Sequence, residues 1–172
     1  SKVLELFRDW LKANRSEANV VYINKELQEF SDIATAKQLY DYAIARLPEG
    51  AENYLLIDEI QDVANYENAL RSLHAEARCQ VIATGSNAYI FSSELGTHLS
   101  GRYIEIKVYN LSYGEFLQFL NMEDSDEALM QYLRIGGLPG LHAFKPEEHS
   151  QINDYFEGVY NTILVKDIVR RE

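Results

Sequence analysis

The stretch Tyr54-Leu-Leu-Ile-Asp-Glu-Ile-Gln61 decides the fold, because four apolar residues stand directly before two carboxylates. A continuous apolar run is typical of a parallel strand that is buried on both faces. The carboxyl edge of such a sheet is where open α/β folds bind ligands. Two adjacent acids are costly to bury unless a cation or a proton compensates them.

Nucleotide hydrolysis gives such an acidic pair a purpose. The first carboxylate holds Mg2+, often through water, and the second polarises the attacking water. This assigns Asp58 to the metal and Glu59 to catalysis. The alternative interpretation is a strand that ends in a solvated acidic turn.

Working outward from this stretch, helical and strand patterns alternate along the chain. Helical spacing covers residues 2–14, 32–47 and 65–77, and short β-branched or apolar runs cover 20–23, 54–57, 80–84 and 103–109. Residues 88–99 predict another helix or a structured loop. This order predicts a parallel sheet with helices on both faces.

The character of the chain changes after Asn110. Residues 111–120, 126–134 and 146–171 have helical patterns, and Gly136-Gly-Leu-Pro-Gly140 breaks them. We therefore place a boundary near residue 110, between an α/β core (1–110) and a small helical region (111–172).

Two further strings end at the same predicted sheet edge. The strand that starts at Gln80 runs into Thr84-Gly-Ser86, where a hydroxyl can bind a phosphate or the attacking water; a capped turn is the alternative. Leu99-Ser-Gly-Arg102 precedes the fourth predicted strand. Arg102 could reach a phosphate, and a surface salt bridge is the alternative.

Composition limits the function classes. The net charge of −11, from 27 acidic and 16 basic residues, does not support non-specific nucleic-acid binding. Cys79 is the one cysteine; it indicates a reducing, cytoplasmic location, and we interpret it as a small residue at a strand edge. No apolar run approaches the roughly 20 residues that a membrane helix needs, so no membrane association is expected.

In this order the strings resemble the AAA+-superfamily ATPases of bacteria and archaea whose ATPase core precedes a domain of unknown function. The matching strings are Leu56-Ile-Asp-Glu-Ile-Gln61, Thr84-Gly-Ser86, Leu99-Ser-Gly-Arg102, Leu111-Ser-Tyr-Gly-Glu-Phe116 and Tyr132-Leu-Arg-Ile-Gly-Gly-Leu-Pro139. The resemblance implies a three-layer αβα P-loop NTPase core. It also implies that Asp58 and Glu59 are the Walker B pair, that Ser86 is the sensor and that Arg102 is an arginine finger.

One departure from the family is large. None of the nine glycines fits the Walker A pattern G-x-x-x-x-G-K-[ST], which cradles the β- and γ-phosphates. In the family this loop precedes a helix like residues 2–14, so Ser1 would be its last residue and a cofactor-binding one. We therefore expect ATP and Mg2+ to bind the full-length protein, and we expect this chain, as a truncated form that lacks the first strand, to be inactive.

Two rival interpretations stay open. Asp58-Glu-Ile-Gln-Asp62 resembles the DExQD string of superfamily 1 helicases, but the next strand of those enzymes ends in Gly-Asp-x-x-Gln, and this one ends in Thr84-Gly-Ser86. The other rival is a degenerate protein-interaction module without a nucleotide.

The resemblance also implies a gap in the sheet, between residues 80–84 and 103–108. Unpaired strand edges recruit partners. We expect the two strands to close up on each other, or a second chain to fill the gap, and a protein partner to bind through the region after residue 110.

Overall fold

In the computed structural model, the described residues are 1–85, 101–140 and 149–167. They form two compact units, Ser1–Ile104 and Glu105–Glu172. The boundary predicted near residue 110 lies a few residues further along the chain than this division.

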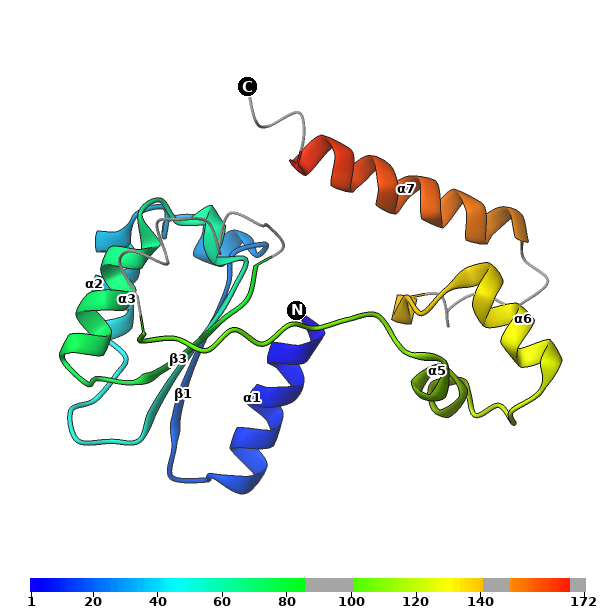
Figure 1. Ribbon diagram of the computed structural model, residues 1–172. Helices are drawn as coiled ribbons and strands as arrows, with labels where there is room; N and C mark the ends of the chain where they lie inside the picture. The colour runs from blue at the N-terminus through cyan, green and yellow to red at the C-terminus, as the bar shows by residue number, and fades with distance from the viewer. Residues whose placement is uncertain (86–100, 141–148, 168–172) are drawn as a thin grey trace. The chain divides into compact units, whose positions relative to one another are not determined.

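The first unit is built on a parallel sheet in the order β1-β2-β3. The strands are β1 (Asn19–Asn24), β2 (Asn53–Asp58) and β3 (Gln80–Ala83). Asn24 is in register with Asp58, and Ile57 is in register with Ala83. The predicted parallel sheet is therefore confirmed, and its carboxyl ends meet at one edge (Figure 1).

Helices cover both faces of this sheet and give it three layers. Helix α1 (Lys2–Asn14) packs Leu4 and Leu11 against Leu56 of β2. On the opposite face, Leu55 and Ile57 belong to a larger core shared with α2 (Ala36–Ile44) and α3 (Tyr66–Ala75). Successive strand residues point to opposite faces, so β2 is apolar without interruption because both of its faces are covered. Short 3-10 helices, η1 (Gln28–Phe30) and η2 (Ile60–Asp62), follow β1 and β2.

Helix α2 begins later than its apolar pattern indicates. The pattern starts at Ile33, but Thr35 caps the helix, and its side chain accepts a hydrogen bond from the Gln38 N–H. The Gln38 side chain in turn accepts a hydrogen bond from the Thr35 N–H. This reciprocal capping box satisfies two N–H groups that would otherwise have no helical partner.

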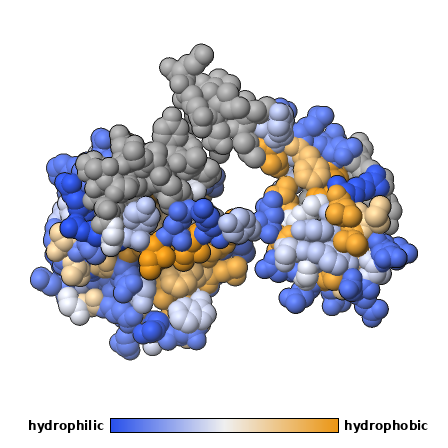
Figure 2. Space-filling view, in the orientation of Figure 1, coloured by the Kyte–Doolittle hydropathy of each residue, from blue (hydrophilic) through white to orange (hydrophobic). Residues whose placement is uncertain are grey.

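The second unit is helical, as the sequence predicts. Helices α5 (Tyr113–Leu120), α6 (Asp126–Ile135) and α7 (His149–Asp167) contribute Phe116, Ile135 and Ile152 to a small core. Apolar side chains also reach the surface of this unit (Figure 2), and Met130 is 66% exposed.

The strand predicted over residues 103–109 is wrong. This stretch has no regular secondary structure, and Ile104, Ile106 and Val108 are 89%, 82% and 70% exposed. Its apolar residues alternate with charged ones, but a strand needs a neighbour that pairs with its backbone, and no described strand pairs with this stretch. The expected closing of this stretch onto residues 80–84 is therefore wrong as well. Filling of the gap by a second chain stays a prediction.

Gly137 shows how closely the chain packs after α6. Gly136 ends the helix with a φ of 73°, a conformation that favours glycine. The Leu111 N–H then donates to the Gly137 carbonyl over 2.8 Å, and a Cβ at Gly137 would collide with the Leu111 carbonyl.

We expect Gly137→Ala to lower the free energy of unfolding of the helical unit by about 1–3 kcal/mol, because the clash is with backbone that cannot rotate away. The matched control is Gly114→Ala in α5, where a Cβ meets nothing within 4 Å. That variant should be neutral or slightly stabilising. Urea unfolding followed by circular dichroism measures both, and equal effects would contradict the packing argument.

Candidate functional site

The site centres on Asp58, the last residue of β2. Its side chain is only 1% exposed, although it carries a carboxylate. Asp58 is in register with Asn24, the last residue of β1, and its neighbour Ile57 is in register with Ala83, the last residue of β3. Asp58 therefore lies where all three strands end. A buried carboxylate is unfavourable unless donors surround it.

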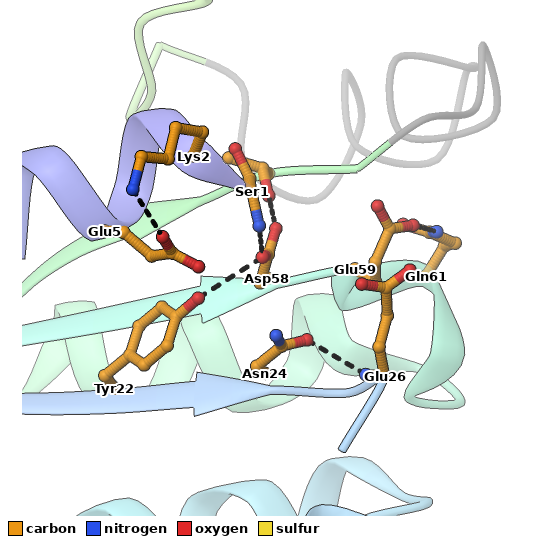
Figure 3. A network of polar contacts seen from close by, with 10 residues as sticks. Ser1, Lys2, Glu5, Tyr22, Asn24, Glu26, Asp58, Glu59 and Gln61 are labelled. Atoms are coloured by element: carbon orange, nitrogen blue, oxygen red, sulfur yellow. Dashed lines mark hydrogen bonds and ion pairs between the residues drawn. The ribbon is translucent and has the colours of Figure 1, made fainter. Parts of the chain in front are cut away.

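Donors from three elements surround Asp58. The Tyr22 hydroxyl of β1 donates to Oδ2 over 3.3 Å, and the Thr84 hydroxyl, just after β3, donates to Oδ1. The backbone nitrogen of Ser1, directly before α1, contacts Oδ2 (Figure 3). Both oxygens of the carboxylate are therefore held from different directions.

Tyr22 remains a donor over the whole physiological pH range. Burial raises the pKa of its hydroxyl, and the nearby Glu5 carboxylate raises it further. The Arg8 guanidinium, 5.2 Å from the ring centroid, acts in the opposite direction. Because burial has the larger effect, the hydroxyl keeps its proton and can donate to Asp58.

Glu59 leaves the strand in a left-handed conformation, with φ 57° and ψ 53°. The strand ends at Asp58, and the turn that follows separates the two carboxylates. Ile60, 1% exposed, anchors the turn in the core, and its N–H donates to the Thr84 carbonyl over 3.1 Å. A non-glycine residue in this region costs about 1–2 kcal/mol, and such strain often marks functional sites.

Gln61 lies beside Glu59 at this turn. Its Nε2 donates to Glu59 Oε2, and Figure 3 shows the pair apart from the cluster at Asp58. The other end of the amide, Oε1, is buried and has no hydrogen-bond partner in the part of the chain that the structure describes. Glu59 itself is half-buried, in contrast to the enclosed Asp58.

The structure brings only some of the predicted site residues together. Ser1 and Asp58 are in contact, and Glu59 follows at the turn. Ser86 lies outside the described residues, so its role stays a prediction. Arg102 is exposed, and its role also stays a prediction.

Sequence reasoning missed the hydroxyl donors to Asp58 and the amide of Gln61. The string ending in Thr84-Gly-Ser86 did indicate a hydroxyl at this edge, but the interpretation chose Ser86 over Thr84. The side chain of Tyr22 lies on the face of the sheet that α1 covers, where it packs beside Leu4 and Leu56. Only the register of β1 on β2 shows that its hydroxyl reaches Asp58.

The carboxylate oxygens of Asp58 and Glu59, as metal ligands, suit a hard cation better than a transition metal. Mg2+ is usually held by one or two carboxylates and keeps waters and substrate phosphates as its other ligands. Asp58 fits this pattern, and within residues 1–85, 101–140 and 149–167 no cluster of three or more His, Cys, Asp or Glu could hold a metal by itself.

Cys79 offers no nucleophile to this site. It lies directly before β3, packs against the core beneath α2 and α3, and its burial raises the pKa of the thiol to about 11. Among the described helices, none has the length and hydropathy to cross a membrane.

Comparison with known proteins gives a family and two relatives. The model of a family described as "AAA domain" matches residues 3–117. An uncharacterized protein of Haemophilus influenzae is 33% identical across 99% of this chain and 44% of its own length. The uncharacterized protein MJ1544 of Methanocaldococcus jannaschii is 27% identical across 88% of this chain and 36% of its own length. The chain thus spans less than half the length of these curated relatives. No solved structure matches the chain significantly.

The donors around Asp58 can be tested by stability. Tyr22→Phe removes a hydroxyl from a buried carboxylate, so we expect it to lower the free energy of unfolding by about 1–3 kcal/mol. Tyr54→Phe is the matched control, because Tyr54 packs in the same core but donates to the exposed Glu52. It should change stability by less than about 0.5 kcal/mol. Urea denaturation at neutral pH measures the free energy of unfolding of both variants. Equal losses would show that the hydrogen bond from Tyr22 to Asp58 adds no more stability than the one from Tyr54 to Glu52.

Proposed function

Because the chain belongs to the AAA family of P-loop ATPases, we propose that the protein containing it binds ATP with Mg2+ and hydrolyses the nucleotide to ADP and phosphate at the sheet edge around Asp58 and Glu59. The observation that carries this proposal is the environment of Asp58. A carboxylate is held nearly without solvent at the carboxyl end of the central described strand, beside a second carboxylate of different accessibility.

Asp58 is the proposed metal ligand of a Walker B pair. The hydroxyls of Tyr22 and Thr84 fix its two oxygens, so the carboxylate is already oriented before a cation arrives. Preorganisation of this kind lowers the cost of binding. When bound, Mg2+ would neutralise charge on the phosphates.

Ser1 is the proposed cofactor-binding residue. Its backbone nitrogen contacts Asp58 Oδ2, which places the residue next to the proposed metal ligand. A serine hydroxyl and a Walker B aspartate share the cation in P-loop enzymes. This contact supports the interpretation of Ser1 as the end of a phosphate-binding loop.

Glu59 is the proposed catalytic base that orients the attacking water. It follows Asp58 directly but stands on a turn, so its carboxylate lies in a different direction from the metal ligand. Ser86, as the sensor, and Arg102, as the finger, complete the proposed set. Their roles rest on the family resemblance.

The phosphate-binding loop itself is proposed to lie outside these 172 residues. The Walker A pattern is missing from the sequence, and the curated relatives are more than twice as long as the region they share with it. Without the lysine and backbone N–H groups of that loop, the β- and γ-phosphates lose most of their contacts.

The test uses the longest natural polypeptide that contains these residues. We expect Mg2+-dependent ATP hydrolysis, and we expect Glu59→Gln to lower kcat about 100-fold or more while nucleotide affinity is retained, because the variant loses the base but keeps Asp58. Glu17→Gln, at an exposed position, is the control and should turn over normally. The 172 residues alone should bind ATP weakly. Undiminished hydrolysis by the Glu59→Gln variant would contradict the proposed site.

A further inference from the structure

Gln61 has a role that the Walker B interpretation does not contain. Its amide Nε2 donates to Glu59 Oε2, and its own Oε1 is buried without a partner among the described residues. We propose that Gln61 is a positioning residue, which holds the Glu59 carboxylate in the orientation that accepts a proton from the attacking water. The proposal rests on the ATPase function proposed above.

The backbone alone does not fix this carboxylate. The left-handed turn sets where the Glu59 side chain starts, but a glutamate has several rotatable bonds, and this one is half-buried. A hydrogen bond from a neighbouring side chain removes that freedom before the substrate binds. Catalytic groups held in this way avoid much of the cost of orientation during the reaction.

The chemistry of the amide fits this task better than a basic side chain would. A lysine or arginine would hold Glu59 through an ion pair and would reduce the charge with which the carboxylate attracts a proton. An amide N–H2 orients the carboxylate and is itself neutral. Gln61 therefore orients the Glu59 carboxylate without neutralising its charge.

The unpartnered Oε1 indicates that the amide of Gln61 does not add to the stability of the fold. A carboxylate only accepts hydrogen bonds, so the N–H2 end of the amide has to face Glu59, and the carbonyl end has to point the other way. There it is buried with no partner in the described part of the chain, which is unfavourable. An apolar side chain of the same shape would avoid this penalty, so the amide is accounted for by what it does to Glu59.

Both ends of the contact are fixed to the core. Ile60, between the two residues, is buried, and its N–H donates to the carbonyl of Thr84 over 3.1 Å. The Asp62 N–H donates to the Glu59 carbonyl over 3.1 Å and closes the turn. Since Thr84 also holds Asp58, the turn that carries Gln61 is tied to the same strand end as the metal ligand.

Two variants of Gln61 separate hydrogen bonding from shape. Gln61→Glu keeps the shape but has no N–H2 to donate, and Gln61→Met keeps the length without polar atoms. In the full-length protein we expect both to lower kcat about 10- to 100-fold, with the KM for ATP within about twofold of the unchanged protein. The control is Gln28→Met, on the exposed 3-10 helix η1, which should behave like the unchanged protein.

A second measurement does not depend on turnover. If the amide is kept for positioning, Gln61→Met should leave the Tm of the 172-residue chain unchanged or raise it, because the unpartnered Oε1 is gone. A structural role predicts the opposite, a fall in Tm. Loss of Tm in parallel with loss of kcat would overturn the proposal.

A double-variant cycle tests whether Gln61 acts through Glu59. In the Glu59→Gln background, Gln61→Met should cause no further loss of kcat, because the group that it positions is already inactive. If the double variant instead loses kcat by the product of the two single effects, the proposal is overturned. If Glu59→Gln abolishes turnover and the Gln61 variants do not reduce it, the positioning role alone is wrong. If the unchanged full-length protein shows no Mg2+-dependent hydrolysis, the proposed function is wrong and the positioning role is overturned with it.

Discussion

The burial of one carboxylate, Asp58, is the constraint on which the first unit depends. A charge that is 1% exposed has to be surrounded by donors, and these come from β1, from the residue after β3 and from the residue before α1. Each donor reaches Asp58 only if its element lies where the structure has it. A shift of β1 by one residue would turn Tyr22 to the opposite face of the sheet and remove its hydroxyl from the carboxylate. The polar centre therefore specifies the register that the apolar core stabilises.

The same constraint explains why the two adjacent acids have such different surroundings. Asp58 completes the strand and is enclosed, and the chain turns immediately afterwards, which leaves Glu59 only half-buried. The left-handed backbone of Glu59 makes this turn, and burial of Ile60 holds it in place. One carboxylate is rigid and desolvated, and its neighbour is half-buried beside a neutral amide. Two carboxylates with different environments can serve as metal ligand and base in one reaction, which is the division of roles proposed here.

The features predicted correctly from the sequence were those with a local cause. Apolar runs without alternation predicted the parallel strands, and the position of Asp58 and Glu59 after such a run placed both at the carboxyl edge. The contacts of Tyr22 and Thr84 could not be predicted, because they depend on register between strands that are far apart in sequence. The pairing of Gln61 with Glu59 depends on a positive φ at a glutamate, which residue preferences argue against.

Residues 103–109 show the limit of local pattern most clearly. Ile104, Ile106 and Val108 alternate with charged residues as in a half-buried strand, yet all three are exposed. Alternation gives a segment one apolar face, but a strand also needs a neighbouring backbone and a surface to cover that face. The strand β3 shows the complementary situation: one edge pairs with β2, and its other edge has no strand beside it among the described residues. An alternating apolar segment therefore becomes a strand only when a neighbouring backbone pairs with it, and an edge without a partner is not enough, just as the burial of Asp58 depends on the donors that neighbouring strands bring.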